Sequence, residues 1–223
     1  MNTTVYLIRH SIRMNKDYID QYNTTQDKTI KNEKIVLSVE GERRAEILCN
    51  EEELQNIDTV YASNCVRTLQ TAKYMLERQN LKVNIDERFD ERRVGIPNDN
   101  VVSDWLTEQY VNPDYKTVGG ESQREVRQRF TEAFNEAIER NKGKRIAIFT
   151  HGYAMTFFIM TWCSFEYIKE TDTFRLCYNG KELFNRRFNA PEVFKLELDE
   201  ENNLIDFKVI EFDDLPLKDG LGR

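Results

Sequence analysis

Residues 5–14 read VYLIRHSIRM, a run of apolar, β-forming side chains that ends abruptly at Arg9-His10, with a second arginine at Arg13. A nearly continuous apolar run of this kind is typical of a strand that is covered on both faces, as in a parallel sheet. We therefore predict a buried strand over residues 4–9. Its charged end would lie at the carboxyl edge of the sheet, where open α/β sheets bind their ligands.

Similar β-type segments recur along the chain and alternate with helical ones. Besides residues 4–9, the predicted strands cover residues 58–63, 81–86, 144–150, 192–198 and 204–212. Strands that alternate with helices indicate an α/β protein with a largely parallel sheet. The predicted fold is a three-layer α/β/α sandwich with a central, mostly parallel sheet.

Three helices are predicted from their capping residues and apolar spacing. One begins at an N-cap on Ser38, and a second follows the 58–63 strand directly, with Ser63 placed to cap it. The third begins with a capping box formed by Ser122 and Glu125. Its apolar residues recur at helical spacing and predict one buried face: Val126, Phe130, Ala133, Phe134, Ala137 and Ile138.

The composition narrows the classes of partner. The 223 residues predict a single domain over residues 1–223, and the net charge of -7 disfavours binding to nucleic acid or to a membrane surface. The N-terminal apolar run is too short for a signal peptide, and the four cysteines form no C-x-x-C pair. We expect free thiols and a location in the cytosol.

Both histidines of the chain follow predicted strands directly. His10 comes after the 4–9 strand and His151 after the 144–150 strand, while Arg67 lies in the helix after the 58–63 strand. A single histidine beside an apolar run is usually a structural residue. Here both histidines of the chain lie at the carboxyl edge of one predicted sheet, which indicates a functional site.

Several motifs then resemble those of the histidine phosphatase superfamily, which includes the phosphoglycerate mutase-like enzymes of its mutase/phosphatase branch. LIRHS (7–11) is similar to the family's Arg-His-Gly signature. Five further ordered matches follow: LSVEGERRA (37–45), YASNCVRTLQTA (61–72), FDERRVG (89–95), GGES (119–122) and FTHGYAM (149–155). Together they span residues 5 to 155, and an ordered set of this length is far more specific than one motif.

The resemblance implies a role for each motif residue. His10 would be the nucleophile that forms a phosphohistidine, and Arg9 and Arg67 would grip the phosphoryl oxygens through planar forks. His151 would donate a further hydrogen bond to the transferring group. Glu91 aligns with the proton donor of the mutase branch, with Asp90 as the next candidate in the same charged run.

Two positions depart from the family pattern. The glycine that usually follows the nucleophile is Ser11 here, and Arg13 stands where the mutase branch carries a small hydroxyl residue. The acid phosphatase and phytase branch has an arginine at that position, so Arg13 is expected to be a third phosphate contact. That branch also has an Asp after its second histidine, where this chain has Gly152.

The expected activity is hydrolysis of a small phosphomonoester, as in a phosphomonoesterase of the histidine acid phosphatase type, without a cofactor or metal. A phosphoglycerate-type phosphomutase and a non-catalytic phospholigand-binding protein are the alternatives. The arginines and the absence of ligand spacing argue against a metal enzyme. A homodimer is an option that the sequence leaves open.

The substrate is not defined by the sequence. The resemblance implies that segments 14–36 and 92–118 form loops or a cap over the site. They offer both cations and aromatic rings to a substrate, namely Lys16, Tyr18, Tyr22, Arg92, Arg93, Trp105, Tyr110 and Tyr115.

Overall fold

The computed structural model describes residues 1–14, 28–96 and 104–212, so Lys16, Tyr18 and Tyr22 lie outside the described residues. The opening strand is β1 (Thr3–Arg9), and all of its residues are buried. It pairs in parallel with β4 (Arg145–Thr150) and antiparallel with β8 (Val193–Leu198). The predicted buried strand is thus confirmed at the centre of a sheet.

The main sheet has six strands in the order β3-β2-β4-β1-β8-β9. The remaining three are β2 (Thr59–Ala62), β3 (Val83–Ile85) and β9 (Leu204–Val209). Because β8 is antiparallel to both of its neighbours, it alone among these six runs against the common direction. All six predicted strands and the mostly parallel sheet are therefore confirmed.

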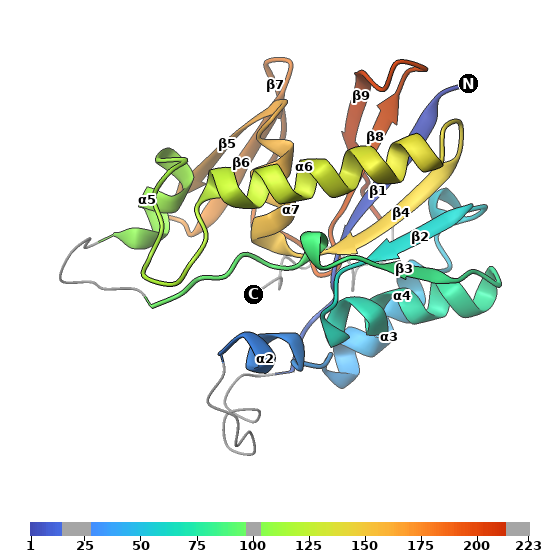
Figure 1. Cartoon of the computed structure of the whole chain (residues 1–223), viewed down its shortest axis with the longest axis horizontal. Coiled ribbons are helices and arrows are strands. Elements are labelled where there is room, and N and C mark those ends of the chain that lie inside the picture. Colours follow the sequence, from blue (N-terminus) through green and yellow to red (C-terminus); the bar gives the residue numbers. More distant parts are fainter. Residues whose placement is uncertain (15–27, 97–103, 213–223) are drawn as a thin grey trace.

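Helices cover both faces of this sheet (Figure 1). One face carries α6 (Gln123–Arg140) and α7 (Gly152–Ile159), and the other carries α3 (Val39–Leu48) and α4 (Val66–Arg78). Alternate residues of β1 serve the two layers, since Val5 and Leu7 pack with α6 and α7, while Tyr6 and Ile8 pack on the α3 and α4 side. This division confirms the three-layer sandwich.

The short elements lie around these layers. They are the helices α2 (Lys28–Glu33) and α5 (Trp105–Val111) and the 3-10 turns η1 (Glu52–Leu54) and η2 (Glu87–Phe89). Within the described ranges, no helix combines the length and the hydropathy needed to cross a bilayer. All four cysteines are free, as expected.

Two of the three predicted caps are confirmed. The Ser38 hydroxyl accepts a hydrogen bond from the Gly41 amide at 3.0 Å, and Ser122 and Glu125 form the reciprocal capping box of α6. The predicted cap on Ser63 is wrong, because α4 begins after Cys65, which makes no side-chain cap bond. Ser63 follows β2 directly at the carboxyl edge of the sheet, and its buried hydroxyl contacts His151 instead.

A second, antiparallel sheet was not predicted. Its strands are β5 (Cys163–Ile168), β6 (Thr173–Tyr178) and β7 (Lys181–Arg186), and it lies beside α5 and α7 in Figure 1. The turn between β6 and β7 holds Asn179 and Gly180 with φ of 49° and 77°. An Asn-Gly pair between alternating apolar residues is a strong hairpin signal, so this sheet was readable from the sequence.

Candidate active site

A cavity of about 1000 Å³ opens where β1, β2 and β4 end. It is lined by Arg9, His10, Arg13, Arg67, Asp90 and Glu91, among others. The topology thus brings together predicted residues that lie far apart in the sequence. His151 is fully buried beside them, with its ring centroid 5.2 Å from that of His10.

The His10 ring is held in one tautomer by the main chain. Its Nδ1 lies 2.7 Å from the Ser11 carbonyl oxygen. Because a carbonyl only accepts hydrogen bonds, Nδ1 carries the proton and Nε2 keeps a free lone pair. Burial, followed by the charges of Arg67 and Arg9, holds the pKa of His10 well below its ordinary value. The ring is therefore neutral near pH 7, as a nucleophile requires.

Arg9 and Arg67 place two buried guanidinium groups at the cavity. Arg9 donates to the Asn189 carbonyl at 3.0 Å, and Arg67 donates to the Asn32 carbonyl at 2.6 Å. Among the described residues, the Nε of each guanidinium is buried without a partner, and neither arginine forms an ion pair with a carboxylate. Unfilled donors of two buried cations make this the natural place for an anion.

Gly152 leaves room for one of these cations. A Cβ atom at position 152 would lie 3.4 Å from Arg9 Nε, which is already van der Waals contact. A larger side chain there would also fill the space beside the unfilled donor. The glycine of the FTHGYAM motif therefore keeps the Arg9 guanidinium accessible.

Arg13 lies at the same cavity but in a different environment. It is exposed, and its backbone forms an isolated antiparallel bridge with Leu37 after β1 has ended. Its charge contributes to lowering the pKa of both Arg9 and His10. The structure thus places Arg13 at the rim of the cavity, with Arg9 and Arg67 in its interior.

Both ring nitrogens of His151 are engaged. Nδ1 accepts a hydrogen bond from Arg67 at 2.9 Å, so Nε2 carries the proton and donates to the Ser63 hydroxyl at 2.7 Å. Burial and the Arg67 charge hold the pKa of His151 well below its ordinary value. In this arrangement His151 orients Arg67, and a direct bond to the transferring group would require one of these contacts to be exchanged.

The Glu91 carboxylate is docked on the first turn of α7. Its Oε1 accepts hydrogen bonds from two backbone amides, that of Ala154 at 3.0 Å and that of Arg92 at 2.9 Å. Its Oε2 lies 3.4 Å from the Tyr153 amide. These contacts hold the carboxylate at the cavity wall, directly after His151 and Gly152. The predicted proton donor and His10 thus line the same cavity.

Asp90 lines the same wall and accepts a hydrogen bond from the Asn64 amide at 2.7 Å. Burial is the main cause that raises its carboxyl pKa to about 6. The folded protein therefore holds this proton more tightly than the unfolded chain, and the ionised form destabilises the fold as the pH rises through 6.

We expect Asp90→Asn to raise the free energy of unfolding by about 1 kcal/mol at pH 8, since Asp90 keeps part of its hydration, and to give no gain near pH 4. Urea unfolding at both pH values measures this. Asp86→Asn is the matched control with the opposite sign, because hydrogen bonds from Arg88 lower the pKa of Asp86. Equal effects of Asp90→Asn at both pH values would contradict the assignment.

One group of side chains in the described ranges has potential metal ligands close together: Cys65, Asp90 and His151, with their ligand atoms within 4.8 Å. The fit to a metal is poor. Both nitrogens of His151 are already used, and burial raises the pKa of the Cys65 thiol to about 11. A cation would also meet the neighbouring Arg67 guanidinium.

Part of the cavity wall is aromatic. Tyr110, Tyr153, Phe174 and Phe188 line it, and Tyr110 packs against Tyr153 and Phe174 with ring centroids 6.2 and 5.9 Å apart. Of the loop residues singled out in the sequence, Arg92, Arg93 and Tyr110 line the cavity; Trp105 and Tyr115 do not appear in its wall.

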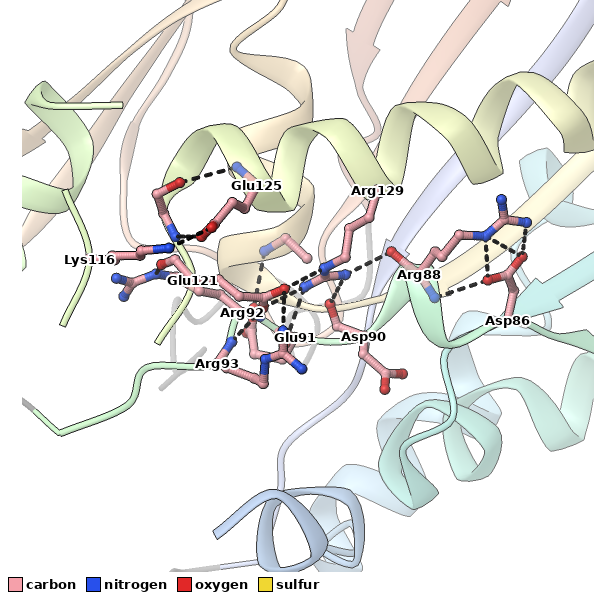
Figure 2. Close-up of polar contacts among 12 residues, drawn as sticks. Asp86, Arg88, Asp90, Glu91, Arg92, Arg93, Lys116, Glu121, Glu125 and Arg129 are labelled. Atoms are coloured by element: carbon pink, nitrogen blue, oxygen red, sulfur yellow. Dashed lines mark hydrogen bonds and ion pairs between the residues drawn. The ribbon is translucent and has the colours of Figure 1, made fainter. Parts of the chain in front are cut away.

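Several residues that shape the site were missed in the sequence. Ser63, Asn32 and Asn189 orient His151, Arg67 and Arg9, two of them through backbone carbonyls that carry no signal in the sequence. Glu121 and Arg129 hold the chain around Glu91, as Figure 2 shows. Glu121 belongs to the GGES motif, so its importance could have been predicted from the sequence. Arg129 is one of many charged residues on α6, and nothing in the sequence distinguishes it.

Comparison with known proteins identifies the family of the chain. The sequence pattern of the histidine phosphatase superfamily (branch 1) matches residues 5–180. A buried histidine beside two buried arginines at the carboxyl edge of an α/β sheet suits the binding of a phosphate group. The chain belongs to the histidine phosphatase superfamily.

Solved structures share the fold at low sequence identity. A mycobacterial glucosyl-3-phosphoglycerate phosphatase is 14% identical, with a TM-score of 0.66 over 96% of this chain and 99% of that one. YhfR of Bacillus stearothermophilus is 21% identical, with a TM-score of 0.63 over 91% and 94%. A phosphoserine phosphatase variant from Entamoeba histolytica is 16% identical, with a TM-score of 0.59 over 92% and 96%. None of the curated protein sequences compared with the chain matches it.

Proposed function

We propose that the protein is a phosphatase that hydrolyses a small phosphomonoester through a phosphohistidine on His10. The observation that carries the proposal is the pairing of a neutral His10, with Nε2 free, and two buried arginines whose Nε donors are unfilled. The nucleophile and the anion-binding donors face one cavity. That combination suits phosphoryl transfer, which depends on positioning and on stabilising charge on the oxygens.

In the first half-reaction, Arg9 and Arg67 bind the phosphoryl oxygens and His10 Nε2 attacks phosphorus. The new P–N bond forms as the P–O bond to the alcohol breaks, and the Glu91 carboxylic acid gives its proton to the leaving oxygen. In the second, the Glu91 carboxylate takes a proton from water, whose oxygen attacks phosphorus. The P–N bond breaks, and phosphate leaves with His10 neutral again.

Related proteins with the same fold support a small substrate, because their names include a glucosyl-3-phosphoglycerate phosphatase and a phosphoserine phosphatase. The narrower assignment from the sequence, a phosphomonoesterase of the histidine acid phosphatase type, goes beyond the match to branch 1 of the superfamily. We retain the broader class, a phosphomonoesterase.

The proposal is tested by incubating the purified protein with a panel of phosphometabolites and measuring released inorganic phosphate. We expect release from at least one monoester without added bisphosphoglycerate. Transfer between positions of a phosphoglycerate, with dependence on bisphosphoglycerate and little phosphate released, would instead identify a mutase. Binding of the panel compounds without turnover would identify a non-catalytic phospholigand-binding protein.

The loops around the cavity are proposed to select the substrate. Asn32 and Glu33 from segment 14–36 line the cavity, as do residues 92–96, Tyr110 and Val118 from segment 92–118. The described parts of both segments therefore support the interpretation of a cap over the site. The free thiols support the proposed cytosolic location.

Arg13 is proposed as a third, peripheral phosphate contact. Replacing it with Ala should lower kcat/KM by about ten- to a hundredfold, corresponding to a charge-assisted hydrogen bond of about 1.5–3 kcal/mol. Steady-state kinetics with p-nitrophenyl phosphate measure the change. Lys34→Ala, which removes a nearby charge of the same sign outside the cavity lining, serves as control. An unchanged kcat/KM would show that Arg13 is a surface residue that does not contact the phosphate.

A further inference from the structure

The segment that carries Glu91 has no regular structure of its own. After the 3-10 turn η2, residues 90–95 belong to neither helix nor strand. Backbone groups in such a segment find no ladder partners, so their hydrogen bonds must come from elsewhere in the fold. The groups that supply these hydrogen bonds therefore also fix the position of the Glu91 backbone, from which its side chain extends.

Arg129, on α6, supplies them. Its Nη1 donates to the carbonyl oxygens of Arg88 at 2.7 Å and of Asp90 at 2.9 Å, and its Nη2 lies 3.4 Å from the Glu91 carbonyl oxygen. Figure 2 shows the guanidinium reaching down from the helix to this stretch of chain. One rigid fork thus holds the main chain before and at Glu91.

Glu121 braces the fork and the chain beyond it. Its carboxylate accepts from Arg129 Nε at 2.9 Å and Nη2 at 3.1 Å, and it also accepts from the Arg93 amide at 2.8 Å. The Glu121 amide donates to the Arg93 carbonyl at 2.8 Å. Burial alone would raise the pKa of Glu121, but the bonds from Arg129 keep it below its ordinary value, so the brace stays charged.

The result is a clamp on both sides of one residue. Arg129 holds the main chain at residues 88–91, Glu121 holds it at Arg93, and the Glu91 carboxylate between them docks on the amides of α7. Sliding the main chain by an ångström would pull that carboxylate away from the cavity. Misplacement on this scale costs general acid catalysis heavily.

We propose that Arg129, braced by Glu121, is the positioning residue of the proton donor. The inference rests on the proposed function, in which Glu91 protonates the leaving group. A residue with this role affects substrates unequally. A poor leaving group needs the proton in the transition state, whereas p-nitrophenolate leaves nearly as well without it.

The test compares kcat/KM for phenyl phosphate and p-nitrophenyl phosphate, which share a ring but differ in leaving-group acidity. Arg129→Lys keeps a cation for Glu121 but cannot span several carbonyls. We expect its loss with phenyl phosphate to exceed its loss with p-nitrophenyl phosphate by on the order of tenfold. Arg127→Lys is the matched control, because Arg127 lies on the same helix and donates to the Phe157 carbonyl at 2.8 Å. It should affect both substrates equally.

Further variants separate the possible failures. Glu91→Gln should show the same inequality between substrates, and to a larger extent. If Glu91→Gln shows it and Arg129→Lys does not, the positioning role is overturned while the proposed function stands. If each of the two variants loses the same activity on both substrates, Glu91 is not the general acid, and that part of the proposed function is contradicted. Should Arg129→Lys not fold, the neutral pair Arg129→Met with Glu121→Gln repeats the test without a stranded buried charge.

Discussion

His10→Ala is expected to lower phosphate release by at least about 10⁴-fold, because the reaction loses the atom that attacks phosphorus. No other histidine can replace it, since the second one, His151, has both ring nitrogens engaged with Arg67 and Ser63. The measurement is single-turnover and steady-state release from p-nitrophenyl phosphate.

The covalent step has its own readout. Wild-type protein quenched during turnover of a ³²P-labelled substrate should carry acid-labile, base-stable label, the behaviour of a P–N bond, and the variant should carry none. Inorganic phosphate should still bind to His10→Ala, because Arg9 and Arg67 remain in place. Turnover within tenfold of wild type, or label on the variant, would refute the covalent mechanism.

Arg67→Lys is expected to reduce kcat/KM by on the order of 10²- to 10³-fold, the cost of losing one preorganised donor set at the reacting group. Lysine keeps the charge but not the fork, and the three nitrogens of Arg67 have different tasks. One binds the Asn32 carbonyl, one holds His151, and Nε is buried and unfilled. Lysine can satisfy at most part of this geometry.

The control is Arg78→Lys, on the same helix, where the guanidinium meets Glu46 at the surface. That variant should keep kcat/KM within about twofold, as exposed ion pairs contribute little. Inhibition by inorganic phosphate should weaken for Arg67→Lys and stay unchanged for Arg78→Lys. Wild-type kinetics in Arg67→Lys would show that Arg67 is structural.

The features that could be predicted were those determined by short stretches of chain. The apolar run of β1, the two histidines at strand ends and the Ser122–Glu125 capping box each depend on neighbouring residues, and each was confirmed. The apolar face of α6 is likewise buried as predicted. Local periodicity and capping chemistry contain enough information for these features.

The features that could not be predicted depend on distant contacts. Ser63 looked like a cap, but its partner His151 is 88 positions away and meets it only because β2 and β4 pair. The same holds for the Arg129 fork, which binds carbonyl oxygens about 40 positions earlier. Main-chain acceptors leave no trace in residue identity, so such partners become visible only in the folded structure.

The hydrogen bond from His10 to the Ser11 carbonyl has an evolutionary consequence. Many catalytic histidines are oriented by a carboxylate, which titrates and which one substitution can remove. Here the orienting group is a backbone carbonyl, which carries no proton of its own to lose and is present whichever residue occupies position 11. The tautomer of His10 therefore does not depend on the Ser11 side chain, which stands where the family pattern has glycine.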